Sequence, residues 1–187
     1  MYLRKPSYYT ANRIDIITGA KVTDINRAEK TVKVGRKIYP YDKLCICTGS
    51  KPFIPPMKNV SGKENALTFL DLASSKAIKE KANGNTRAVV IGAGLIGMKA
   101  AEGLSKICKS VDVAELSPRI ISSILDAKSS KGVKKYIEEK GRIKFHLGDT
   151  VTEAKSRGKK ITSVILKSGK ELKCDMLILD VGVRPET

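Results

Sequence analysis

The stretch that decides the fold runs from residue 88 to residue 97 and has the sequence AVVIGAGLIG. Its apolar start predicts a buried strand, and three glycines follow in the pattern G-x-G-x-x-G. In a strand–turn–helix unit the first glycine allows the tight turn, the second lets a diphosphate approach the backbone, and the third lets helix and strand pack closely. The first amide groups of such a helix bind anions. The stretch therefore predicts a dinucleotide-binding turn, whose cofactor-contacting residues would be Gly92, Ala93, Gly94, Leu95, Ile96 and Gly97.

An acidic residue stands where this kind of site needs one. Residues 111–115 predict the next strand, and Glu115 ends it 18 residues after Gly97. A carboxylate there can accept both hydroxyls of a ribose and repels a 2′-phosphate, so it favours NAD over NADP. Arg119 could weaken that preference by meeting such a phosphate. The alternative for Glu115 is a solvated acid at the end of a strand.

Two parts of the chain repeat. Residues 13–23 (RIDIITGAKVT) match residues 142–152 (RIKFHLGDTVT), and residues 41–52 (YDKLCICTGSKP) match residues 174–185 (CDMLILDVGVRP). A repeat of this size implies one supersecondary unit used twice. Only the second copy follows a G-x-G-x-x-G pattern, and the matching glycine of the first copy would fall before Met1. We therefore expect a piece of a protein with two dinucleotide sites, in which the first phosphate loop lies outside this chain.

The remaining pattern predicts an α/β fold. The first part shows short β-type runs at 14–18, 31–34 and 44–47, and the prolines after residue 51 break regular structure. The second part alternates expected strands and helices and ends in a meander. The expected helices are 71–81, 95–109 and 127–140, and the expected strands are 87–92, 111–115, 143–147, 161–166 and 176–181.

We thus expect a Rossmann-like dinucleotide-binding domain with a parallel sheet and a β-meander, plus a partial second domain. The expected bounds are 1–57 for the partial, β-rich domain, 58–65 for a connector, 66–182 for the domain that holds loop 92–97, and 183–187 for a return toward the first domain.

Composition limits the classes of function. The formal net charge is +17, but the lysines are spread along the chain, so a nucleic-acid-binding protein is the less favoured interpretation despite several tyrosines among cations near the start. No run approaches a membrane span and the first residues are not a signal peptide, so we expect a soluble cytoplasmic protein. The four cysteines lack metal or redox spacing and are expected to be buried thiols, with Cys47 the one that a cofactor could approach.

The chain resembles the pyridine nucleotide-disulfide oxidoreductase family of flavoproteins, especially its NADH oxidase, nitrite reductase and ferredoxin or rubredoxin reductase branches. The resemblance covers nearly the whole chain. It rests on Tyr41-Asp42-Lys43-Leu44 before Thr48-Gly49-Ser50, on loop 92–97 with Ala101-Glu102, on Glu115, Arg119 and Leu125-Asp126, and on Gly182-Val183-Arg184-Pro185.

The resemblance implies a Rossmann-like FAD/NAD(P)-binding fold, in which a similarly folded NAD-binding domain is inserted into an FAD-binding domain. Residues 1–57 would then be a partial FAD-binding domain and residues 66–182 the NAD-binding domain. The resemblance also implies hydride transfer from NADH to FAD. It places Thr48, Gly49 and Ser50 against FAD and the backbone of Val22 near the adenine of FAD. It places the backbone of Val151 near the adenine of NAD and Gly182 near the nicotinamide. The electron acceptor would contact parts outside this chain, and an oligomer could form through a further C-terminal region.

Two residues depart from the family pattern. Lys99 stands where the family usually has a glutamate that orients the nicotinamide, and it could either assist the diphosphate or be solvated. Asp180 ends an apolar strand, as a carboxylate on the cofactor side or as a turn residue. His146 shows no acid or serine partner in the sequence and is interpreted as structural, so no catalytic residue or metal ligand is expected. A stand-alone nucleotide-sensing Rossmann module without redox activity is the alternative function.

Overall fold

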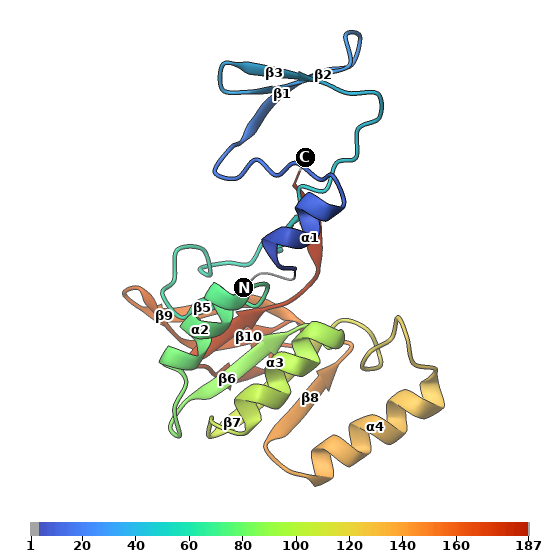
Figure 1. Cartoon of the computed structure of the whole chain (residues 1–187). Coiled ribbons are helices and arrows are strands. Elements are labelled where there is room, and N and C mark those ends of the chain that lie inside the picture. The colour runs from blue at the N-terminus through green and yellow to red at the C-terminus, as the bar shows by residue number, and fades with distance from the viewer. Residues whose placement is uncertain (1–3, 187) are drawn as a thin grey trace. The chain divides into compact units, whose positions relative to one another are not determined.

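The computed structural model describes residues 4–186, which form two compact units, the first ending at Cys47 and the second beginning at Thr48 (Figure 1). The first unit holds a short helix and an antiparallel meander in the order β1-β2-β3. No residue between 4 and 47 is buried. This unit therefore has no closed hydrophobic core among its described residues. Its elements are α1 (Pro6–Ala11), β1 (Val22–Asn26), β2 (Thr31–Val34) and β3 (Lys37–Pro40).

The second unit is built on a five-stranded parallel sheet in the order β5-β12-β6-β7-β8. Its helices pack on one face of that sheet. A three-stranded antiparallel meander, in the order β11-β10-β9, packs on the opposite face (Figure 1). A two-stranded ribbon, β4 with β13, completes the unit. The bounds are β4 (Ser50–Pro52), β5 (Ala66–Thr68), α2 (Leu72–Lys81), β6 (Arg87–Ile91), α3 (Leu95–Ser105), β7 (Ser110–Glu115), α4 (Ala127–Glu139), β8 (Ile143–Leu147), β9 (Val151–Arg157), β10 (Lys160–Leu166), β11 (Glu171–Lys173), β12 (Met176–Leu179) and β13 (Val183–Pro185).

The cores on both sides of β6 explain why residues 88–91 are all apolar. Ala88 and Val90 belong to the core beneath the helices, whereas Val89 and Ile91 belong to the core beneath the meander. A strand covered on both faces has no solvent side, so no polar alternation is expected. The predicted Rossmann-like α/β class, with a parallel sheet and a meander, is confirmed.

Helices α2 and α4 each begin at a short polar side chain that caps them. Asp71 accepts a hydrogen bond from the Ser74 amide at 2.7 Å before α2, and Asp126 accepts one from the Ser129 amide at 2.7 Å before α4. Such caps satisfy amide groups that have no partner within the helix. Helix α3 ends at Ser105, four residues before its expected end.

The two meanders confirm that the repeat is structural. In each, the first strand has a β-bulge at an equivalent threonine, Thr23 in β1 and Thr152 in β9. The two threonine hydroxyls also donate equivalent hydrogen bonds, to the carbonyl oxygens of Lys33 at 3.3 Å and Ile165 at 3.2 Å. A shared bulge with a shared hydrogen bond is a specific feature. The sequence echo therefore marks one supersecondary unit present twice.

Two expected strands of the first copy are wrong, because residues 14–18 and 44–47 have no strand structure. Their counterparts in the second copy are β8 and β12, which pair with the parallel strands β7 and β6. The described part of the first unit offers no such partner strands, and an unpaired strand is not stable. For the same reason the expectation of four buried thiols fails: Cys45 and Cys47 are exposed, with their sulfurs 3.5 Å apart.

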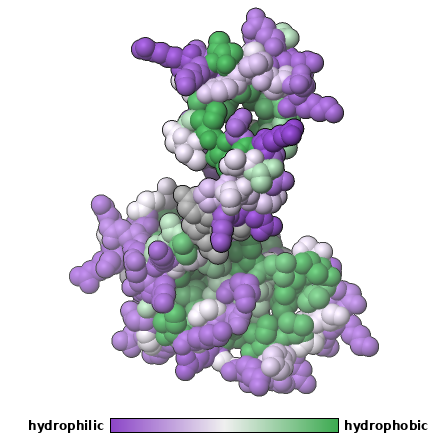
Figure 2. Space-filling model, viewed as in Figure 1, coloured by the Kyte–Doolittle hydropathy of each residue, from purple (hydrophilic) through white to green (hydrophobic). Residues whose placement is uncertain are grey.

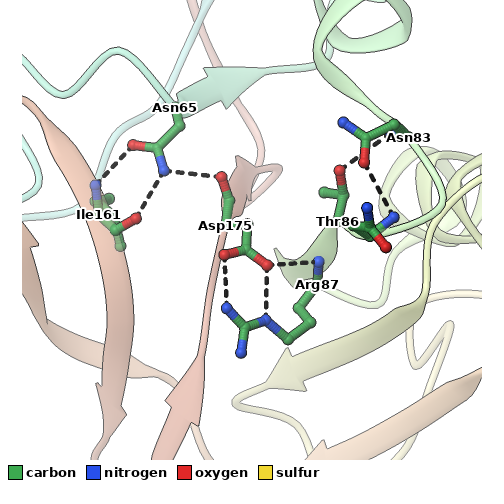
Figure 3. Close-up of polar contacts among 7 residues, drawn as sticks. Asn65, Asn83, Thr86, Arg87, Ile161 and Asp175 are labelled. Atoms are coloured by element: carbon green, nitrogen blue, oxygen red, sulfur yellow. Dashed lines mark hydrogen bonds and ion pairs between the residues drawn. The ribbon is translucent and has the colours of Figure 1, made fainter.

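The connector before β5 is fixed by one side chain. Asn65 donates its Nδ2 to the carbonyl oxygens of Ile161 (2.9 Å) and Asp175 (2.8 Å) and accepts the Ile161 amide at 2.8 Å (Figure 3). The Asp175 carboxylate in turn accepts Nε and Nη2 of Arg87 at 2.6 and 2.7 Å and the Arg87 amide at 2.9 Å. These contacts join the connector, the meander and the central strands.

The visible surface is a mixture of hydrophilic and apolar residues. Hydrophilic residues are spread over the visible face, with apolar patches between them (Figure 2). Among the helices of the described residues, none is long and apolar enough to span a membrane.

Candidate functional site

The glycine-rich turn between β6 and α3 lies beside a groove of about 300 Å³ at the carboxyl ends of the parallel strands. Ligands of open α/β sheets bind at this edge. Four of the predicted site residues line the groove: Gly92, Gly94, Glu115 and Gly182. The other lining residues are Ile91, Ala114, Leu116, Thr150, Asp180 and Val181. The sequence interpretation offered Asp180, as one of two alternatives, as a carboxylate on the cofactor side, and it did not single out the other five. All except Thr150 lie within a predicted strand or directly after one.

The three glycines of the turn have different surroundings. Gly92 has φ +103°, and a Cβ there would lie 1.9 Å from the carbonyl oxygen of Asp180. A Cβ on Gly97 would lie 2.2 Å from the carbonyl oxygen of Gly92. A Cβ on Gly94 would meet nothing within 4 Å. Gly92 and Gly97 are thus required by packing, whereas the space beside Gly94 is open toward the groove, where a ligand backbone can approach.

The start of α3 is suited to an anion. Gly94 is its N-cap and offers no side-chain hydrogen bond, and the first turn contains no acidic residue. The first amide groups of a helix lack partners within the helix and carry partial positive charge. Leu95 and Ile96 form this first turn, and both side chains are exposed. The residues present therefore fit the diphosphate of a dinucleotide.

Glu115 closes the opposite side of the groove. Its Oε2 accepts the Ala93 amide at 2.7 Å, and its Oε1 accepts the Ser117 amide at 2.7 Å. The carboxylate is thereby held against the turn, and each oxygen keeps a lone pair for a further donor. A fixed acceptor pair at the end of the second strand suits the two hydroxyls of a ribose.

Asp180 faces the same groove. It follows β12, is partly buried, and its Oδ2 lies 3.0 Å from the position of a Cβ on Gly97. Burial raises the pKa of this carboxyl above its ordinary value, and a hydrogen bond from the Gly97 amide partly offsets the rise. Of the two interpretations offered by the sequence, the geometry is that of a carboxylate on the groove side.

Three predicted residues lie away from the groove. Lys99 is on the outer surface of α3, where its Nζ pairs with Glu102 at 2.7 Å. Glu102 also pairs with Lys106 at 3.1 Å, and the two lysines lower its pKa to about 2. Arg119 donates to the carbonyl oxygen of Ser122 at 3.1 Å. The side chain of Val151 is buried in the core beneath the meander, next to the groove-lining Thr150.

Of the four residues expected against FAD, Val22 belongs to the first unit, and Thr48, Gly49 and Ser50 belong to the second. Val22 is 49% exposed in β1. Gly49 has φ +79° with nothing near its Cβ position, Ser50 begins β4, and the Thr48 hydroxyl donates to the carbonyl oxygen of Glu186. The chain contains one G-x-G-x-x-G, at 92–97. The part of the chain that the structure describes thus fits a nicotinamide dinucleotide but offers no phosphate loop for a flavin.

One interpretation from the sequence needs correction. His146 does have an acidic partner, because its Nε2 lies 2.7 Å from Oδ1 of Asp112, and both side chains are largely buried. The two residues come from adjacent strands, β8 and β7. Neither lines the groove, and the pair joins these two strands away from it.

A larger cavity of about 990 Å³ lies between α3 and α4. It is bounded by apolar side chains such as Leu95, Met98 and Ile137 and by several lysines. It lies on the helical face of the sheet, and it lacks Gly92, Gly94 and Glu115. The chemistry of the turn points to the smaller groove.

The chain is similar in sequence to known proteins. The family model "Pyridine nucleotide-disulphide oxidoreductase" matches residues 6–187. The chain is 29% identical to the nitrite reductase (NADH) large subunit of Escherichia coli over 98% of its own length and 22% of the relative's. It is 34% identical to an NADH oxidase of Methanocaldococcus jannaschii over 98% of its own length and 42% of the relative's.

The fold matches solved structures equally well. A ferredoxin reductase from Rhodopseudomonas palustris superposes with a TM-score of 0.86 at 26% identity, covering 100% of this chain and 46% of that one. The chain thus spans less than half the length of these relatives. Since the family model covers nearly every residue, the chain belongs to the pyridine nucleotide-disulphide oxidoreductase family.

Proposed function

We propose that this chain is the NAD(H)-binding portion of a flavin-dependent NADH:acceptor oxidoreductase. The observation that carries the proposal is the groove at loop 92–97, in which Glu115 is hydrogen-bonded to the Ala93 amide and the start of α3 is left for an anion. In the intact protein the nicotinamide would donate hydride to FAD, and the cofactors supply the redox chemistry. The residues of this chain bind and orient the dinucleotide.

The expected roles divide along the groove. The diphosphate would be held by the loop residues Gly92, Ala93, Gly94, Leu95, Ile96 and Gly97. Glu115 would bind the adenosine ribose. Val151 would lie near the adenine and Gly182 near the nicotinamide. Thr48, Gly49, Ser50 and Val22 would contact FAD once the rest of that site is present. Lys99 is paired with Glu102 and Arg119 with the carbonyl oxygen of Ser122, so a contribution from either side chain would require it to leave that partner.

The domain bounds belong to the same proposal. Residues 1–57 would be a partial FAD-binding domain, residues 58–65 the connector, residues 66–182 the NAD-binding domain, and residues 183–187 the return toward the FAD-binding domain. The compact units divide between Cys47 and Thr48, because the ribbon of β4 and β13 packs with the second unit.

A preference for NADH over NADPH follows from Glu115. The Glu115 carboxylate and a 2′-phosphate are like charges, and two like unit charges about 4 Å apart repel by roughly 4 kcal/mol at an effective dielectric constant of about 20. Dissolved salt lowers this repulsion. We therefore expect a 2′-phosphate to weaken binding by about ten- to a hundredfold.

Calorimetric titration of the full chain with NADH, NADPH and FAD tests the proposal. We expect weak binding of NADH, weaker binding of NADPH, and no stable flavin complex. The Glu115→Gln variant keeps a hydrogen-bond acceptor and should reduce the selectivity for NADH. Stoichiometric flavin on the purified chain, or equal affinity for NADH and NADPH in the wild type, would contradict the proposal.

The electron acceptor is part of the proposal as well. Relatives include a terpredoxin reductase and a rubredoxin-NAD(+) reductase, and a structural neighbour was solved as a covalent complex with putidaredoxin. We propose that the intact protein likewise passes electrons from its flavin to a small acceptor.

A further inference from the structure

Asp180 occupies the crevice where the order of the sheet reverses. After β6 the chain crosses to β7 on one side, while β12 lies on the other side of β6. Ligands of open parallel sheets bind at such a reversal, between the carboxyl ends of the two diverging strands. Asp180 directly follows β12, and Gly92 directly follows β6. The carboxylate therefore stands opposite the phosphate loop.

The contacts of Asp180 fix it to that loop. Its carbonyl oxygen leaves no room for a Cβ on Gly92, and its Oδ2 lies close to Gly97 in the first turn of α3. Among residues 4–186, no other side chain forms an ion pair or a hydrogen bond with this carboxylate. The Gly97 amide is the group that favours its charged form, and desolvation opposes that form.

The groove contains acids but no base among its lining residues. Glu115 from β7 is the other titratable group, and its oxygens are already held by two amides. The loop 92–97 contributes no titratable side chain. After β8, Thr150 lines the groove, and the neighbouring Asp149 turns its Oδ1 to the Thr150 and Ser168 amides. A diphosphate would thus enter a groove with two carboxylates and no neutralising side chain.

We propose that Asp180 couples dinucleotide binding to proton uptake, so that the ligand binds when this carboxyl is protonated. One proton moves from solvent to the carboxylate, which becomes a neutral acid that can donate to an oxygen of the ligand. Burial favours the same neutral form, which is why the pKa of Asp180 lies above its ordinary value before any ligand arrives. This inference rests on the proposed dinucleotide site and adds a pH dependence to it.

The test compares NAD⁺ binding to the full wild-type chain and to Asp180→Asn by calorimetry between about pH 5 and pH 9. Wild-type affinity should fall by up to about tenfold per pH unit above the pKa of Asp180, because only the protonated fraction is competent. Buffers with different ionisation enthalpies should reveal proton uptake. Asp180→Asn should bind with an affinity that does not depend on pH and should exceed the wild type at alkaline pH.

Two controls make the result specific. Adenosine, which has no diphosphate, should bind with no pH dependence, as followed by amide chemical shifts. The Glu115→Gln variant should keep the pH dependence of NAD⁺ binding. If Asp180→Asn does not fold, the wild-type pH profile and its proton uptake decide the question.

The possible failures are distinguishable. Wild-type affinity that stays constant across this pH range, or an Asp180→Asn variant with the wild-type slope, overturns the role of Asp180 and leaves the dinucleotide site intact. Absence of NAD⁺ binding at every pH overturns both.

Discussion

The substitution Gly97→Ala probes how closely α3 packs against the phosphate loop. A Cβ on Gly97 would lie 2.2 Å from the carbonyl oxygen and 3.1 Å from the carbonyl carbon of Gly92, where ordinary contact begins at 3.4 Å. Both neighbours are backbone atoms, so relief requires a shift of the turn itself by about 1 Å. A clash of this kind costs about 3 kcal/mol.

The gain in helix propensity offsets part of this cost. Replacing glycine by alanine inside a helix contributes about 1 kcal/mol, so the net loss for Gly97→Ala should be about 2 kcal/mol. For a domain of this size the melting temperature should fall by roughly 4–8 °C. Differential scanning calorimetry of both proteins measures it.

Gly103 provides a matched control in the same helix. It is exposed, and a Cβ there meets nothing within 4 Å. Gly103→Ala should therefore stabilise the chain by about 0.5–1 kcal/mol. If Gly97→Ala is as stable as Gly103→Ala, the close packing of α3 on the loop is refuted.

Three further outcomes follow from contacts outside the groove. Arg87 lowers the pKa of Asp175 through hydrogen bonds, so this ion pair stabilises the fold at neutral pH and the stabilisation is lost as the pH falls below about 4. Asp175→Asn should therefore lower the free energy of unfolding by about 1–2 kcal/mol at neutral pH in urea titrations, a value that allows for the partial exposure of the pair. A difference between variant and wild type that persists in acid would contradict this. Asn65→Ala leaves the Ile161 amide and the carbonyl groups of Ile161 and Asp175 without this partner, and it should lower the free energy of unfolding by about 2–3 kcal/mol. An unchanged urea midpoint would show that these hydrogen bonds of Asn65 do not stabilise the fold. Limited proteolysis should cut the first unit, which ends at Cys47, earlier than the second, since no described residue of the first unit is buried. Early cleavage within the parallel sheet would contradict the division into two units.

Much of the second unit could be predicted because its signals are local. The apolar run of β6, the glycines after it and the carboxylate of Glu115 all lie within one βα-unit, and they meet in the structure as expected. Strand β9 was harder to foresee. The bulge at Thr152 puts Val151 and Ala154 on the same buried side, which breaks the alternation that identifies a strand.

The positions of long side chains depended on contacts that the sequence does not reveal. Lys99 pairs with Glu102 one turn along the helix instead of reaching the groove, and Arg119 bonds a local carbonyl. The groove position of Asp180 depends on β12 pairing with β6, which lies almost 90 residues earlier in the chain. The strands expected at 14–18 and 44–47 failed for a similar reason, because a strand exists only where another strand pairs with it.

The central claim is that loop 92–97 and Glu115 bind a dinucleotide, and amide NMR of the chain during titration with NAD⁺ tests it most directly. The account predicts the largest shifts at Gly92, Gly94 and Glu115, and loss of those shifts in Gly94→Ala, whose Cβ enters the open space while costing at most about 1 kcal/mol of stability. Shifts confined to the cavity between α3 and α4, or unchanged binding by a folded Gly94→Ala variant, would contradict it.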